Sequence, residues 1–239
     1  MNEQPIKIAI LDSVPKFHWR DDNGVTDGQK FVDLLAPENV NAKFDIFYVS
    51  EYEFPDIIES YDGYLLTGSP VSVHDNHDWI KMLSEFVGQA DNKNKPIVGV
   101  CFGHQLIAKY YGGVVGNNEK GWMIGSFPLE IKKKFPWMKN TLDTTDLYHF
   151  NKERVTKLPE GAISFASTKD YPDFAYTLGN NIACLQGHPE QPKRAMYNFL
   201  EVTKKVLTEQ ELEKAKQRIE NGKSDSSVWA QWIMEFFCS

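Results

Sequence analysis

The sequence predicts an α/β fold in which a doubly wound, mostly parallel sheet is flanked by helices. Short β-rich runs alternate along the first half of the chain with segments of helical spacing, and several of these runs stop at glycine, serine or proline. The 239 residues, 41% of them hydrophobic, are enough to bury one full core. Ligands of such sheets bind at the carboxyl ends of the strands, so we expect the site near positions 12, 68 and 101.

Four apolar runs in the first half of the chain are typical of strands. The first two each carry a charged residue, whereas the last two carry none and look buried on both faces. Apolar residues at helical spacing predict helices over 79–87 and 106–111, the second ended by Gly112 and Gly113. The expected strands are 6–11, 44–49, 63–67 and 97–100.

The pattern after Gly113 is richer in strands, and we expect some of them to run antiparallel at the sheet edge. The chain then ends in helices, because Thr208 and Glu211 have capping-box spacing and Asn221-Gly222 supplies a stop. We therefore expect one domain over residues 1–207 and a helical extension over 208–239. The candidate strands of this half are 126–131, 162–166, 174–178 and 182–186.

The last predicted helix has one apolar, largely aromatic face. We expect this face to pack on the preceding domain, whereas an exposed face would mark a subunit contact, so a homodimer stays open. The face consists of Val228, Trp229, Trp232, Ile233 and Phe236.

The charge balance makes nucleic acid and membrane poor partners. The chain carries 26 Lys and Arg against 33 Asp and Glu, a net charge of −7 that repels phosphate backbones and anionic lipids. No apolar run approaches the roughly 18 to 20 residues that cross a bilayer. Three widely spaced cysteines, Cys101, Cys184 and Cys238, do not make a disulfide framework, so a reducing cytoplasm is expected.

The sequence gives no support for a metal or a cofactor. It has no paired-cysteine framework, and the His, Asp and Asn residues of 74–78 stand just ahead of a predicted helix, where Asp and Asn more often cap. Residues 116–121 copy the glycine spacing of a phosphate loop, but Trp122 stands where lysine is required. We expect neither a metal, nor ATP, nor another cofactor.

Cys101 is the first candidate for chemistry. The run Gly99-Val100-Cys101-Phe102-Gly103 lies where a strand becomes a helix, which is how a nucleophile is presented on a tight turn. The helix N-terminus favours thiolate over thiol, and the Phe102 amide is placed to meet an oxyanion. The alternative is a buried structural cysteine between glycines needed for close packing.

His188 is the candidate base, because it follows another predicted strand in the run Gln186-Gly187-His188-Pro189-Glu190. Glu190 stands two residues away, and the fixed φ of Pro189 helps hold its carboxylate near the imidazole. Glu190 would then fix the tautomer and stabilise the imidazolium. Taken alone, the motif is more often a loop histidine beside a solvated glutamate.

These two segments together resemble the class I glutamine amidotransferase family over roughly residues 6–207. The resemblance implies a flavodoxin-like sheet and a Cys-His-Glu triad. In that triad Cys101 attacks the γ-glutamyl amide of glutamine or a similar compound, His188 moves protons and Glu190 orients His188. Ammonia leaves first, and water then releases glutamate from a thioester.

The resemblance also implies further site residues. Thr67-Gly68-Ser69-Pro70 is similar to the second oxyanion element of the family, which assigns backbone N–H groups of Gly68 and Ser69 to the oxyanion hole beside that of Phe102. Gln105 corresponds to a position that lines the glutamine pocket. His149 follows a tyrosine where the family commonly has serine, and it is expected to contact substrate.

Three functions stay open. The first is a stand-alone glutamine amidotransferase or glutaminase subunit that delivers ammonia to a separate synthase, since many relatives are fused to one. The second is a γ-glutamyl peptidase cleaving glutathione-like conjugates: Gly187 stands where synthase relatives usually have a bulky residue, leaving space for a larger leaving group. The third is a catalytically silent protein that binds a γ-glutamyl metabolite. A closed pocket sized for one glutamine favours the first, and an open groove favours the second.

Overall fold

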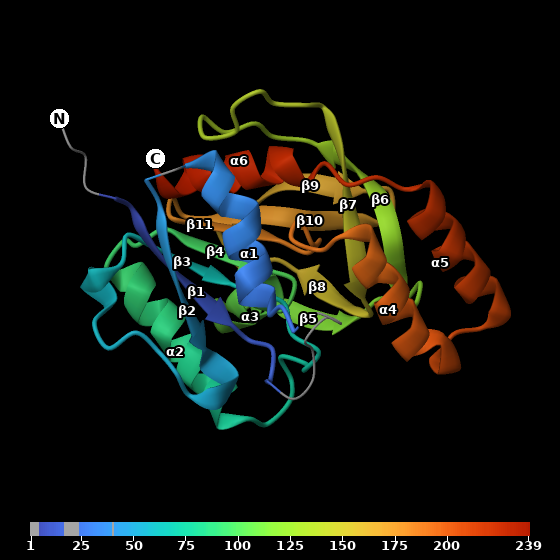
Figure 1. Cartoon of the computed structure of the whole chain (residues 1–239), viewed down its shortest axis with the longest axis horizontal. Helices are drawn as coiled ribbons and strands as arrows, with labels where there is room; N and C mark the ends of the chain where they lie inside the picture. Colours follow the sequence, from blue (N-terminus) through green and yellow to red (C-terminus); the bar gives the residue numbers. More distant parts are fainter. Residues whose placement is uncertain (1–4, 17–23, 40) are drawn as a thin grey trace.

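The computed structural model describes residues 5–16, 24–39 and 41–239. Nine strands of these residues form one sheet, and five of them pair in parallel in the order β2-β1-β3-β4-β11 (Figure 1). This is the flavodoxin-like order, and it confirms the predicted doubly wound core. The parallel strands are β1 (Lys7–Asp12), β2 (Lys43–Tyr48), β3 (Gly63–Leu66), β4 (Ile97–Val100) and β11 (Ile182–Leu185).

Antiparallel strands lie at one edge of the sheet, as the sequence predicts. The sheet continues from β11 in the order β10-β9-β6-β7, and a separate two-stranded sheet pairs β5 with β8. The sequence did not predict β5, β7 or β8, because polar residues interrupt their alternation. These strands are β5 (Val114–Asn117), β6 (Met123–Ile131), β7 (Thr144–Asn151), β8 (Glu153–Lys157), β9 (Ile163–Thr168) and β10 (Tyr171–Leu178).

Helices cover both faces of the parallel strands. Alternate side chains of β1 point to opposite faces of the sheet. Ile8 and Ile10 join the apolar cluster on one face, and Ala9 and Leu11 join the cluster on the other. The first cluster includes α1 (Asp27–Leu35) and α6 (Ser226–Phe237), and the second includes α2 (Asp78–Asn92) and α3 (Phe102–Tyr110). Short 3-10 helices lie at Ala36–Glu38, Val49–Glu51, Ile58–Ser60 and Lys204–Val206.

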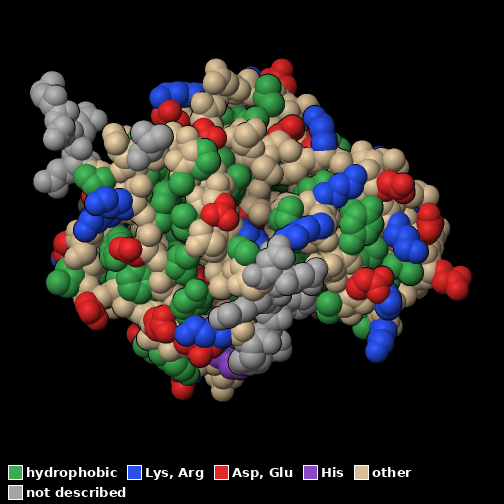
Figure 2. Space-filling view, in the orientation of Figure 1, with side chains coloured by type: hydrophobic (Ala, Val, Ile, Leu, Met, Phe, Trp, Pro, Cys, Tyr) green, Lys and Arg blue, Asp and Glu red, His purple; other side chains and the backbone are tan. Residues whose placement is uncertain are grey.

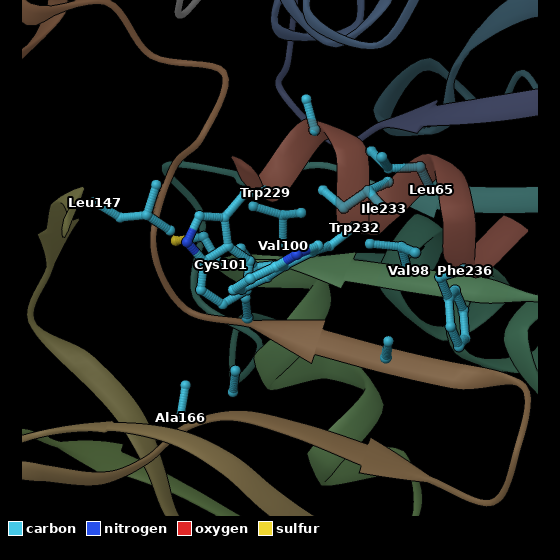
Figure 3. Packing of buried hydrophobic residues seen from close by; sticks show 14 of the residues in the cluster. Leu65, Val98, Val100, Cys101, Leu147, Ala166, Trp229, Trp232, Ile233 and Phe236 are labelled. Atoms are coloured by element: carbon cyan, nitrogen blue, oxygen red, sulfur yellow. The ribbon is translucent and has the colours of Figure 1, made fainter. Parts of the chain in front are cut away.

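The C-terminal helices pack against the rest of the chain. Helices α4 (Lys193–Thr203) and α5 (Glu209–Asn221) share a third apolar cluster with β6 and β7, and the capping box of Thr208 and Glu211 opens α5. Trp229 and Trp232 of α6 are 2% and 0% exposed and lie beside β4 (Figure 3). The aromatic face of the last helix is therefore covered by its own chain, and it is not the exposed subunit contact that the sequence left open.

The outer surface carries mixed charge. Basic and acidic side chains are interspersed over the face drawn in Figure 2, rather than gathered by sign. Among the helices that the structure describes, none combines the length and the apolar character that a bilayer crossing requires.

Candidate functional site

Cys101 sits at a sharp turn between β4 and α3. Its backbone has φ 51° and ψ −98°, a conformation that costs a non-glycine residue on the order of 1 to 3 kcal/mol. The close packing of α3 enforces it: a Cβ on Gly103 would lie 2.6 Å from the Leu66 Cβ, so only glycine lets the helix approach β3. The Cys101 N–H donates to the Leu185 carbonyl at 2.9 Å, which fixes the turn to β11.

His188 lies beside Cys101 at the end of the neighbouring strand. The Nδ1–H of His188 donates to Glu190 Oε1 at 2.7 Å, and the Glu190 side chain is fully buried. That bond leaves Nε2 free for the sulfur. Burial alone would lower the pKa of His188, but the charges of Glu190 and Cys101 and hydrogen bonds to both raise this pKa well above its usual value.

Gly68, just after the end of β3, lies close to both Cys101 and His188. A Cβ added at Gly68 would lie 3.1 Å from the His188 Cε1 and 3.5 Å from the Cys101 Cβ, so all three residues meet at one point. The three residues that the sequence proposed as a triad are thus brought together at the carboxyl ends of the parallel strands. A thiol beside an imidazole that a carboxylate orients can attack an acyl carbon and can pass a proton to a leaving group.

A pocket of about 620 Å³ opens at this point. Its walls include Cys101, His188, Gly68, Ser69 and Phe102, all of them residues expected at the site. The Phe102 amide belongs to the first turn of α3, where N–H groups have no partner within the helix and can face an acyl oxygen.

A pair of buried side-chain amides is joined to the Cys101 sulfur by hydrogen bonds. The Gln186 Nε2 donates to the Cys101 Sγ at 3.4 Å, and the Gln186 Oε1 accepts a bond of 2.9 Å from the Gln105 Nε2. That same nitrogen of Gln105 also donates to the Glu153 carbonyl at 2.9 Å. Gln105 lines the pocket as expected, but both hydrogens of its amide are used by the protein. The sequence alone does not indicate this role for Gln186.

His149 does not line this pocket. It is 0% exposed, and its ring lies against Phe127 and Phe174, with centroids 5.0 and 4.7 Å away. Burial, helped by the neighbouring His188, lowers the pKa of His149 to about 3. Successive residues of β7 face opposite sides: Tyr148 joins the cluster with α4, so His149 points the other way. The expected contact between His149 and substrate therefore finds no support in this geometry.

Gly187 does not widen the pocket either. A Cβ at this position would meet the Phe174 Cζ at 2.7 Å and Leu147 at 3.2 Å, so the glycine makes room for apolar packing behind His188. The expectation that its small size leaves space for a larger leaving group is wrong.

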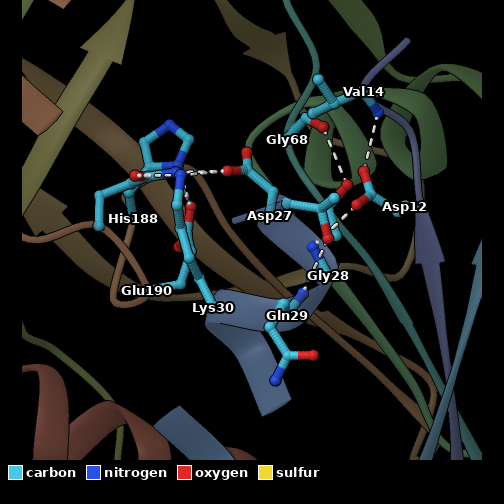
Figure 4. Close-up of polar contacts among 12 residues, drawn as sticks. Asp12, Val14, Asp27, Gly28, Gln29, Lys30, Gly68, His188 and Glu190 are labelled. Atoms are coloured by element: carbon cyan, nitrogen blue, oxygen red, sulfur yellow. Dashed lines mark hydrogen bonds and ion pairs between the residues drawn. The ribbon is translucent and has the colours of Figure 1, made fainter. Parts of the chain in front are cut away.

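Helix α1, which the sequence analysis did not anticipate, adds polar groups to the pocket. Lys30 donates to Asp27 Oδ1 at 2.8 Å and to Gln191 Oε1 at 3.2 Å (Figure 4). The Gln191 Nε2 in turn donates to Asp27 Oδ1 at 3.0 Å and to Glu190 Oε1 at 3.1 Å. A local signal for this helix is Thr26, whose hydroxyl caps it by accepting from the Gln29 N–H.

An aromatic wall completes the pocket. Trp122, Phe150 and Phe199 all line it; the Phe150 ring is 5.3 Å from Trp122 and 4.6 Å from Phe199 between centroids. Within the described ranges, no cluster of three or more His, Cys, Asp or Glu side chains is arranged to hold a metal ion.

Comparison with known proteins decides the family. The model of the family "Glutamine amidotransferase class-I" matches residues 29–203, which include Cys101, His188 and Glu190. The chain belongs to this family. In a solved structure of a glutamine amidotransferase from Thermotoga maritima, the same fold covers 99% of this chain and 100% of the other at a TM-score of 0.74 and 18% identity.

Two relatives of this class I chain carry names that describe different activities. A protein named gamma-glutamyl peptidase 3 from Arabidopsis thaliana is 30% identical over 216 residues, which cover 86% of each chain. A protein named GMP synthase (glutamine-hydrolyzing) from Wolbachia pipientis is 27% identical; the match covers 84% of this chain but 42% of the synthase. The first relative therefore matches along most of its length, and the second along less than half.

Proposed function

We propose that this protein is a cysteine-dependent γ-glutamyl peptidase, which hydrolyses the amide bond between a γ-glutamyl group and an amino acid or peptide. The observation that carries the proposal is the contact between the buried Glu190 carboxylate and His188 at 2.7 Å, beside Cys101 in a pocket of about 620 Å³. These groups supply a nucleophile, a proton carrier and an orienting charge in one place.

The reaction runs in two halves. The Cys101 sulfur attacks the δ-carbon of the γ-glutamyl amide, and the oxyanion faces the backbone amides at Phe102 and Gly68. The carbon–nitrogen bond then breaks, and the leaving nitrogen takes its proton from His188. Water, deprotonated by His188, attacks the thioester, so that glutamate leaves and the thiol of Cys101 is restored.

The raised pKa of His188 suits this first half. An imidazolium beside a thiolate is the form in which the sulfur is nucleophilic and the proton is already available for the leaving nitrogen. The Glu190 charge supports that form, and the Gln186 amide donates a hydrogen bond to the sulfur.

Two observations favour a peptide over glutamine as substrate. The pocket volume lies within the range of about 300 to 1,000 Å³ that drug-sized ligands occupy, so it holds more than one amino acid. The relative named gamma-glutamyl peptidase 3 matches this chain over 86% of both lengths. The alternative, ammonia supply from glutamine to a separate synthase, is supported by the match to the GMP synthase.

Glutamate release tests the proposal. We expect purified protein to release glutamate from γ-glutamylglycine with a higher kcat/KM than from glutamine. Cys101→Ala abolishes release, whereas Cys238→Ala, a change at the exposed cysteine, leaves it intact. Release from glutamine alone would favour ammonia supply, and release from neither compound by folded protein would contradict both enzyme functions.

A further inference from the structure

The Lys30 ammonium is held inside the pocket rather than on the surface. Its side chain and that of Asp27 are each 11% exposed, and their ion pair measures 2.8 Å. A bond to Gln191 Oε1 uses a second N–H of Lys30, and among the described residues no other partner takes the third, which can therefore bind a ligand. Lys30 and Asp27 both line the pocket that contains Cys101 and His188.

Lys30 lies on the imidazole side of the pocket. Gln191, which accepts from Lys30, donates to the same Glu190 oxygen that His188 contacts. Figure 4 shows Lys30 and Asp27 next to the His188 and Glu190 pair. The Gln186 amide contacts the Cys101 sulfur, and Gln105 contacts Gln186.

This placement matters for the leaving group. In the proposed reaction the leaving nitrogen receives its proton from His188, so the atoms attached to that nitrogen extend toward the imidazole side. An amino acid or peptide leaving group ends in a carboxylate, and a lysine ammonium with one N–H to spare is a suitable partner for it. Ammonia, the leaving group of glutamine, has no such group.

A second Lys–Asp ion pair, on α2, is exposed to solvent and serves as a comparison. Lys81 and Asp78 occupy the same positions in the first turn of α2 as Lys30 and Asp27 do in α1. Their distance is 3.7 Å and their side chains are 66% and 79% exposed. Ordering a lysine side chain costs conformational entropy, and an exposed ion pair offsets little of that cost. The ion pair of Lys30 is shorter and shielded from solvent, and it holds the ammonium at a fixed place in the pocket, as a ligand-binding group requires.

We propose that Lys30 forms a subsite for the carboxylate of the leaving group, which selects γ-glutamyl compounds with an acidic, peptide-like leaving group over glutamine and over neutral amides. Asp27 and Gln191 hold the ammonium in place. The inference rests on the proposed γ-glutamyl peptidase function, because the subsite at Lys30 binds the leaving group of that reaction.

The test compares substrates that differ only in this charge. Kinetics are measured on γ-glutamylglycine and γ-glutamylglycylglycine, each as the free acid and as its C-terminal amide. We expect Lys30→Gln to lower kcat/KM for the acids by about ten- to a hundredfold, as the loss of a charge-assisted hydrogen bond does, and to change it little for the amides. Lys30→Arg retains the preference, and the matched variant Lys81→Gln changes neither.

An equal loss on acids and amides, or no loss at all, overturns the subsite and leaves the proposed function standing. Binding provides an arm without turnover: calorimetry on Cys101→Ala protein with the same acids and amides. If the wild-type enzyme cleaves none of the compounds, the proposed function fails. In that case, tighter binding of the acids than of the amides that depends on Lys30 would still support the subsite. Equal binding of acids and amides would overturn the subsite as well.

Discussion

His104 is a fully buried base, and this makes the stability of the protein depend on pH. It lies in the first turn of α3 with its ring 4.9 Å from that of Tyr176, and neither ring nitrogen has a hydrogen-bond partner among the described residues. Burial lowers the pKa of His104 to about 3. We expect His104→Leu, which removes the titrating group but stays apolar, to protect the fold against acid.

The sign and size follow from linkage. Unfolded histidine titrates near pH 6.5, so between about pH 6.5 and 3 the unfolded chain binds more protons than the folded one, and stability falls as the pH falls. From pH 7 to pH 5 the His104 contribution to this loss is about 2 kcal/mol. Asp12, whose pKa burial raises to about 6, works in the opposite direction, but it is present in both proteins and cancels from their difference.

Urea unfolding of both proteins at pH 7 and pH 5 measures the effect. The free energy of unfolding of His104→Leu, relative to that of the wild type, should be about 2 kcal/mol higher at pH 5 than at pH 7, so that the variant is relatively more stable in acid. Between pH 7 and pH 8 the difference should not change. If the difference in the free energy of unfolding between the two proteins is the same at pH 5 and pH 7, then His104 is not buried as a neutral base. That result would refute the reasoning.

Three further changes probe the site. Gly103→Ala should lower the free energy of unfolding by about 1 to 3 kcal/mol, because its Cβ would collide with β3; unchanged urea midpoints would contradict the packing argument. Gln186→Met, which keeps the size but removes the donor, should slow alkylation of Cys101 by iodoacetamide at neutral pH about two- to tenfold, and an unchanged rate would remove the role of that amide. Glu190→Gln should lower kcat at least about a hundredfold and shift the pH dependence of kcat/KM to lower pH, since Glu190 raises the pKa of His188; wild-type turnover would end its assignment.

Much of the fold could be predicted because the information is local. The parallel strands are short apolar runs ended by turn residues, and the observed β4 has the expected bounds 97–100. The glycines around Cys101 and the proline after His188 are equally local signals. The carboxyl-end rule of doubly wound sheets then predicted, correctly, that the two segments meet.

The remaining features depend on contacts between distant segments. Lys30 and Gln191 are 161 positions apart, and nothing near either residue indicates the other. The side to which His149 points depends on the register of β7, a strand whose polar residues hide its alternation. Gly187 looked like a space beside the substrate because the sequence does not reveal that Phe174 packs against it.

Labelling by a glutamine-like diazoketone, 6-diazo-5-oxo-L-norleucine, tests the central role of Cys101 most directly. The reagent binds in place of a γ-glutamyl compound and alkylates the nucleophile that its diazoketone meets there, and peptide mass spectrometry then locates the adduct. The account predicts one adduct, on Cys101, which γ-glutamylglycine prevents and which His188→Ala slows. Intact protein that stays unlabelled, or an adduct on the exposed Cys238 instead, would contradict it.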